Sequence, residues 1–134
     1  MADPDYWEDA ILHISKRDDV LSKIIEQNLE PRLNPHGDVF RTLIKSIVGQ
    51  QISIQAADAT WDRMVGLLGE INPNEICKAG LMDLRGCGLS MRKAEYISGV
   101  SEMWMDGRLD IDWGGLEQIE IRDRLLSIRG VGPW

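Results

Sequence analysis

Residues 125–134 read LLSIRGVGPW, a helical apolar pattern that runs into a Gly-Val-Gly turn. The two glycines, Gly130 and Gly132, tolerate a positive φ and leave the backbone amides around them uncovered. Such amides, together with the dipole of a following helix, can bind a phosphate oxygen without any net positive charge. The pattern therefore predicts a tight, phosphate-binding turn between two helices, with a simple structural end of a helix as the alternative.

A copy of this turn lies earlier in the chain, where residues 84–88 read LRGCG. Two copies do not make a solenoid, and a glycine pair that only ends a helix explains the first copy equally well. Elsewhere apolar residues recur at intervals of three and four, and no hairpin of alternating strands is visible. We therefore expect an all-α chain with about seven or eight short helices and no sheet.

Side chains that accept hydrogen bonds from free amides mark the helix starts. Prolines and glycines mark loops, as in LEPRLNPHG at residues 29–37. The last helix is predicted over residues 116–128, just before the Gly-Val-Gly turn. The predicted N-caps are Asp3 (with Pro4 as the first helical residue), Asp18 or Asp19, Asp38, Ser53, Asn72 and Ser90.

The predicted core lies mainly on the two helices that follow Asp38 and Ser53, because their apolar residues form single stripes. Small alanines in the second helix favour close packing of one helix on another. The stripes consist of Val39, Phe40, Leu43, Ile44, Ile47 and Val48 in the first helix, and of Ala56, Ala57, Thr60, Trp61, Met64, Leu67 and Leu68 in the second.

The charge of the chain is unevenly distributed. The formal net charge is −7, which argues against a protein that coats nucleic acid through bulk electrostatics. Residues 1–40 carry four basic and nine acidic residues, whereas residues 41–134 carry eleven and thirteen. Any contact with nucleic acid must therefore come from local groups and backbone amides in the second part.

Several classes of protein are excluded by residue patterns. No run approaches the roughly 18 apolar residues of a membrane span, and the acidic start MADPDYWEDA is unlike a signal peptide. A cytoplasmic or nucleoid-associated protein is therefore expected. Cys77 and Cys87 form no CxxC pair and are interpreted as reduced, structural residues. His13 and His36 lack partners at ligand spacing, so we expect no metal and no cofactor.

Three segments together resemble a known family. GQQIS at 49–53, LRGCGLSMRKAEYI at 84–97 and LLSIRGVGPW at 125–134 are similar, in order and spacing, to the 3-methyladenine DNA glycosylase II (alkylbase DNA glycosylase) branch of the helix-hairpin-helix glycosylase superfamily. The resemblance runs from about Asp38 to Trp134. It implies an all-helical fold, and a base excision repair enzyme that flips alkylated purines such as 3-methyladenine out of double-stranded DNA and cleaves the N-glycosidic bond.

The resemblance implies roles for particular residues. Arg129 and Val131 would form, with Gly130 and Gly132, the hairpin that grips one DNA strand. Gln51, with Gln50 beside it, would fill the gap left in the base stack, because unstacking a base costs a few kcal/mol; two polar loop residues are the structural alternative. Trp134 would stack on a cationic base in the pocket, with plain hydrophobic packing as its alternative.

The segment at 84–97 supplies further candidates. Ser90, Arg92 and Lys93 lie at the start of a helix and are candidates for contacts with DNA phosphates, although a solvated helix face explains them equally well. The remaining tryptophans, Trp7, Trp61, Trp104 and Trp113, are expected to pack in the core or on the surface.

No catalytic residue can be carried over from the family. Its catalytic aspartate follows the hairpin by a helix and a loop, whereas Asp106, Asp110 and Asp112 precede the hairpin. We therefore expect residues 1–37 to be acidic N-terminal helices, and residues 38–134 to be a glycosylase core that is truncated within the hairpin motif and inactive alone. Its exposed apolar faces would favour self-association.

Two other functions remain open. The chain could be a non-catalytic helix-hairpin-helix module that binds the DNA backbone, or a structural helical domain whose acidic surface meets a protein. Gln51 discriminates between the glycosylase and the backbone-binding module, because a protein that only binds the DNA backbone has no use for a side chain that enters the base stack. The hypothesis of a structural domain predicts no salt-sensitive affinity for DNA.

Overall fold

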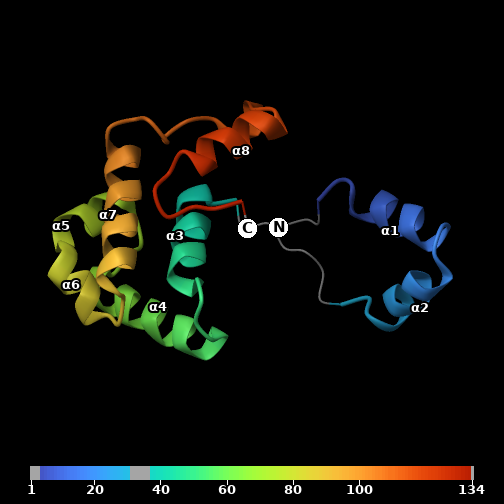
Figure 1. Cartoon of the computed structure of the whole chain (residues 1–134), viewed down its shortest axis with the longest axis horizontal. Helices are drawn as coiled ribbons and strands as arrows, with labels where there is room; N and C mark the ends of the chain where they lie inside the picture. Colours follow the sequence, from blue (N-terminus) through green and yellow to red (C-terminus); the bar gives the residue numbers. More distant parts are fainter. Residues whose placement is uncertain (1–3, 31–36, 134) are drawn as a thin grey trace. The chain divides into compact units, whose positions relative to one another are not determined.

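The computed structural model describes residues 4–30 and 37–133 and divides the chain into two compact units, residues 1–37 and 38–134. Within the described residues every regular element is a helix, which confirms the all-α prediction (Figure 1). Each of these helices is too short or too polar to cross a membrane.

The first unit is a pair of short helices, α1 (Trp7–Ser15) and α2 (Asp19–Gln27), that pack on each other. Asp18 caps α2 as predicted, because its carboxylate accepts from the amides of Val20 and Leu21. The predicted start of α1 at Pro4 is wrong: the carbonyl of Pro4 accepts from the amide of Trp7 in a turn, and the helix begins after it. Asp3, the predicted cap, lies outside the described residues.

The second unit contains the other helices. Asp38, Ser53, Asn72 and Ser90 each cap the helix predicted for them, since a side-chain oxygen accepts from an amide in the first turn. The elements are α3 (Val39–Gly49), α4 (Ile54–Leu68), α5 (Pro73–Ala79), α6 (Leu81–Gly86), α7 (Met91–Met105), the 3₁₀ turn η1 (Trp113–Gly115) and α8 (Gln118–Leu126).

Two regions of this unit differ from the prediction in their helix boundaries. The six residues of α6 are too few to show a helical period, so the sequence did not separate α6 from α5. The last helix spans Gln118–Leu126 and not residues 116–128. Glu117 and Glu120 form a reciprocal capping box at its start, η1 occupies the residues before it, and Ser127 is its C-cap.

The core of the second unit is built around α7, which packs against α3, α5 and α6 (Figure 1). Most of the predicted stripes point inward, but Val39, Ala56 and Leu67 are exposed. Buried residues of the three main helices are Phe40, Ile44, Ile47 and Val48 of α3, Thr60, Trp61 and Met64 of α4, and Ala94, Ile97, Val100 and Ser101 of α7.

Aromatic rings close one side of this core. Trp104 meets Phe40 edge-on at 5.1 Å and stacks on Trp113 at 6.1 Å between ring centroids. Trp61 is buried, with the cations of Arg41 and Lys45 over its ring. These three tryptophans serve in packing, as predicted. Of the two free cysteines, Cys87 is buried and fits a structural role, whereas Cys77 is exposed.

Candidate nucleic-acid interface

The loop of residues 50–53, called the plug loop after the role that the family resemblance implies for Gln51, connects α3 to α4 and has Gln51 on the surface. Gln51 has a φ of 57°, and among the described residues it is the one non-glycine in the left-handed region. Such a conformation costs about 1–3 kcal/mol and persists only where the surroundings enforce it. The backbone of the loop is therefore held in place by its neighbours.

Lys93 of α7 supplies one of these restraints. Its ammonium group donates hydrogen bonds to the carbonyls of Val48 and Gln50, each at 2.7 Å. These carbonyls lie at the C-terminal end of α3, where they lack helical partners and the helix dipole favours a cation. Burial lowers the pKa of Lys93 below its ordinary value. Two of its three donors thus point into the protein and not toward a phosphate.

The hairpin turn, residues 127–132, follows α8 and rests on Tyr96 of α7. Gly130 has a φ of 97°, and a Cβ at this position would overlap the Tyr96 ring. The guanidinium of Arg129 lies 5.7 Å from the centroid of the same ring. Gly132, in contrast, has open space where a Cβ would stand. Packing against Tyr96 therefore requires a glycine at position 130, whereas no neighbouring atom requires one at position 132.

The plug loop and the hairpin turn are joined directly. The side-chain amide of Gln50 donates to the carbonyl of Gly130 at 3.0 Å, a contact between residues 80 apart in the chain. Two adjoining clefts share the residues Gln50, Gln51, Ser90 and Lys93; one of them extends to Thr60 and Gly88, and the other to Arg92 and Tyr96. Three separate sequence segments thus meet at one surface.

The other predicted residues are placed as follows. Ser90 caps α7, with its hydroxyl accepting from the amide of Lys93 at 3.1 Å. Arg92 is exposed at the edge of the second cleft. The amide of Val131 donates to the carbonyl of Ile128 at 3.1 Å, so it closes the turn. Trp134 lies outside the described residues.

Asp106 and Asp112, two of the aspartates that precede the hairpin turn, have local structural partners. Asp106 follows the C-terminal end of α7, a 15-residue helix about 22 Å long, whereas Ser90 and Lys93 are at its start. Its carboxylate pairs with Arg108 at 2.6 Å, and hydrogen bonds from Arg108 lower the pKa of Asp106. Asp112 caps η1. Within the described ranges no group of His, Cys, Asp and Glu residues could hold a metal ion.

One functional residue was missed by sequence reasoning. Tyr96 carries the hairpin turn, although nothing in its local pattern distinguishes it from a core aromatic. A signal was available in the spacing of Lys93 and Tyr96, because residues three apart share one face of a helix.

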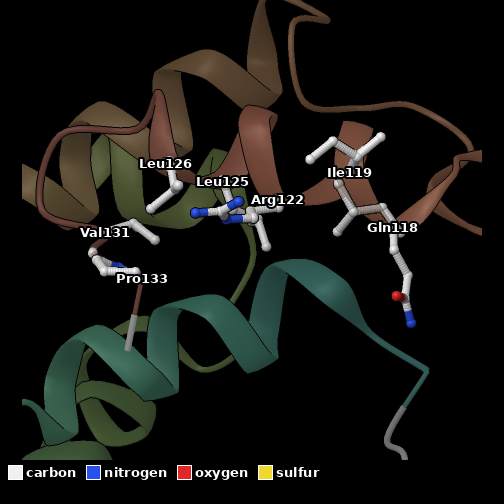
Figure 2. A pocket seen from close by; sticks show the side chains of 9 residues that line it. Gln118, Ile119, Arg122, Leu125, Leu126, Val131 and Pro133 are labelled. Atoms are coloured by element: carbon white, nitrogen blue, oxygen red, sulfur yellow. The ribbon is translucent and has the colours of Figure 1, made fainter.

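A shallow apolar groove borders the hairpin turn. It is formed by α8 and the segment that follows it, and has a volume of about 610 Å³. Figure 2 shows Leu125, Leu126, Val131 and Pro133 along its wall, and Ile119 toward the start of α8. Ile119 is 58% exposed. The groove is an apolar surface next to the polar site.

Comparison with known proteins identifies the family. The model of the HhH-GPD superfamily base excision DNA repair proteins matches residues 44–126, a range that includes the plug loop and α7 and ends two residues before Ile128. A DNA-3-methyladenine glycosylase of Saccharomyces cerevisiae is 31% identical over 140 residues, covering 91% of this chain and 47% of the yeast protein. The chain spans about half the length of the curated relatives it matches.

Solved structures agree. A DNA-3-methyladenine glycosidase from Bacillus halodurans is 35% identical with a TM-score of 0.74, over 90% of this chain and 57% of that one. A 3-methyladenine DNA glycosylase from Schizosaccharomyces pombe, solved in complex with abasic DNA, is 25% identical with a TM-score of 0.80, over 94% and 65% of the two chains. Since the family model matches more than half of its residues, the chain belongs to the HhH-GPD superfamily of base excision DNA repair proteins.

Proposed function

We propose that this chain is the DNA-engaging part of a base excision repair glycosylase that removes alkylated purines such as 3-methyladenine by flipping them out of the duplex. The proposal rests above all on one observation: an exposed glutamine in a strained conformation stands beside a glycine turn on one surface. The names of the relatives support the class of reaction, and the abasic DNA bound by the Schizosaccharomyces pombe protein supports the type of ligand.

The hairpin turn is the proposed phosphate site. The amide of Val131 is already bonded to Ile128, so the amides of Gly130 and Gly132 are the donors that we assign to a phosphate oxygen. Arg129 and Arg92 are both exposed and would add positive charge locally on an otherwise acidic chain. Such contacts set the position on DNA without reading its sequence.

Gln51 is the proposed plug. Its side chain would occupy the space left in the stack when a base is extruded, which offsets part of the unstacking cost. We assign Trp134 to the base pocket, where an indole face favours a cationic purine over the neutral parent base.

We assign none of the described acidic residues to catalysis, because Asp106 and Asp112 have structural partners and both precede the hairpin turn. Residues 1–134 alone are therefore expected to bind damaged DNA and to release no detectable 3-methyladenine, since loss of a charge-stabilising group costs orders of magnitude in rate.

We further propose that residues 38–134 form the glycosylase core, that residues 1–37 are an acidic helical appendage, and that the protein works on chromosomal DNA in the cytoplasm or nucleoid. The exposed apolar residues of the first unit, such as Val20 (68%), and the groove beside α8 would support self-association. Sedimentation velocity over a range of protein concentrations tests this part of the proposal: a single monomer boundary throughout contradicts it.

The DNA-binding function is tested by fluorescence anisotropy with two duplexes, one intact and one with a central tetrahydrofuran abasic analogue. We expect tighter binding to the abasic duplex, and dissociation constants that rise with salt concentration for both. Gln51→Ala should weaken abasic binding more than intact binding. Equal, salt-sensitive binding by wild type would favour the non-catalytic backbone module, and salt-independent or absent binding would favour a structural domain.

A further inference from the structure

Helix α7 supports both DNA-facing segments from one face. Lys93 bonds to the carbonyls that lead into the plug loop, and Tyr96, three residues later, carries the hairpin turn under Gly130 and Arg129. The side chain of Gln50 then ties the two segments to each other. A single rigid helix therefore sets the separation between the plug and the phosphate site.

The backbone of Gln51 is restrained on both sides. On the N-terminal side the ammonium of Lys93 holds the carbonyl of Gln50 at 2.7 Å. On the C-terminal side the hydroxyl of Ser53 caps α4 by accepting from the amide of Ala56 at 3.1 Å. Hydrogen bonds from a charged donor are stronger than neutral ones, so the bonds from Lys93 offset much of the cost of the positive φ at Gln51.

We propose that Lys93 is a positioning residue for base extrusion: by holding the carbonyls of Val48 and Gln50 it presents Gln51 to the base stack at a fixed separation from the hairpin turn. This inference rests on the proposed function. In this role Lys93 affects DNA binding through the position of Gln51 and not through a direct contact with a phosphate. Because the loop is ordered before DNA binds, binding does not include the entropic cost of ordering the loop.

The test is Lys93→Met, which keeps most of the length of the side chain and removes its donors. The readouts are the ratio of dissociation constants for intact and abasic duplexes, and the fluorescence of a 2-aminopurine placed next to the abasic site. We expect the ratio to fall about tenfold toward unity and the 2-aminopurine signal on binding to be lost, with affinity for the intact duplex within about twofold of wild type. Lys93→Arg should restore part of the ratio.

The control is Lys78→Met, the same substitution at an exposed lysine of α5, which pairs with Glu75 outside the site. It should change neither readout. The double variant Lys93→Met with Gln51→Ala should show the same ratio as Gln51→Ala alone, because in both variants there is no glutamine side chain for Lys93 to position. Lys93→Met with Gln51→Gly should regain thermal stability without regaining the ratio, because glycine accepts the positive φ but has no side chain to insert.

The outcomes separate this inference from the proposed function. If Gln51→Ala lowers the ratio and folded Lys93→Met does not, the role of Lys93 is refuted and the proposed function stands. If Gln51→Ala also leaves the ratio unchanged, the plug itself is refuted. If Lys93→Met does not fold, Gln50→Leu carries the test, because it removes only the tie to Gly130; a ratio equal to that of wild type would then overturn the coupling between plug and hairpin turn.

Discussion

The two glycine turns of this chain, LRGCG at 84–88 and IRGVG at 128–132, look like copies in sequence and differ in backbone. In the first turn Gly86 still belongs to α6, and the second glycine, Gly88, takes the positive φ of 102°. In the second turn the first glycine, Gly130, takes it, with a φ of 97°. In the second copy the positive φ thus comes two motif positions earlier, and the helix ends four positions earlier, at Leu126 where the first helix ends at Gly86.

The neighbours of each turn explain the difference. A Cβ at Gly88 would meet the flexible guanidinium end of Arg63 at 3.0 Å and the hydroxyl oxygen of Thr60 at 3.4 Å, and no ring. The backbone at Gly130 instead lies directly on the ring of Tyr96, an approach that only glycine allows. A repeated motif therefore fixes the presence of a turn, and the packing partner decides which glycine makes it.

Gly130→Ala should have the largest effect. The new methyl group overlaps the Tyr96 ring and also forces an alanine into a positive φ, so we expect a loss of about 3 kcal/mol in the free energy of unfolding. Urea denaturation followed by circular dichroism measures it. In a double-mutant cycle with Tyr96→Ala the two losses should be less than additive; full additivity would show that the ring does not set the position of the turn.

Gly132→Ala tests the accessible glycine of the same turn. Its Cβ would meet open space, so the stability should stay within about 0.5 kcal/mol of wild type. The affinity for duplex DNA should fall about fivefold whatever the sequence, because the methyl group would stand between the amides and a phosphate. Anisotropy titrations provide the measurement, and unchanged affinity in a folded variant would remove the phosphate site from this turn.

The two arginines of the turns, Arg85 and Arg129, form a matched pair, since both are exposed. Arg129→Met should weaken duplex binding about threefold and reduce the slope of log K against log salt concentration by about 1, as expected for the loss of one phosphate contact. Arg85→Met is the control and should leave the slope unchanged. Equal slopes for the two variants would mean that both turns, or neither, face DNA.

Gly86→Ala should give the smallest effect, and with the opposite sign. Gly86 is helical and has open space around a Cβ, so alanine should stabilise the chain by about 0.5 kcal/mol through its higher helix propensity. The measurement is the same urea denaturation used for Gly130→Ala. A destabilised variant would show that the first turn needs glycine at the same position as the second.

The features predicted correctly from the sequence are those that depend on local chemistry. The caps of α2, α3, α4, α5 and α7 were found because a short polar side chain and the amides it accepts from lie within three residues. The start of α1 was misplaced because Asp3-Pro4 fits a capping pattern, whereas the carbonyl of Pro4 takes part in a turn with the amide of Trp7.

The features that were missed depend on packing between distant segments. Lys93 at the start of a helix resembles a phosphate ligand, and only the fold shows that its ammonium reaches the end of α3, 43 to 45 residues away in sequence. The packing of Gly130 on the ring of Tyr96 likewise joins residues that are far apart in the sequence. Family resemblance named the segments that meet at this surface, but it could not supply the contacts between them.

The contrast between the two thiols has a practical consequence for following the molecule in solution. Cys77 is exposed on α5, whereas Cys87 is buried within the first glycine turn, and burial raises the pKa of both thiols. A maleimide reagent should therefore modify Cys77 before Cys87, which can react only when the turn opens, because the two thiols differ in access to the reagent. The slow labelling phase then reports the opening rate of that turn, while a dye on Cys77 leaves the proposed DNA-binding surface unmodified.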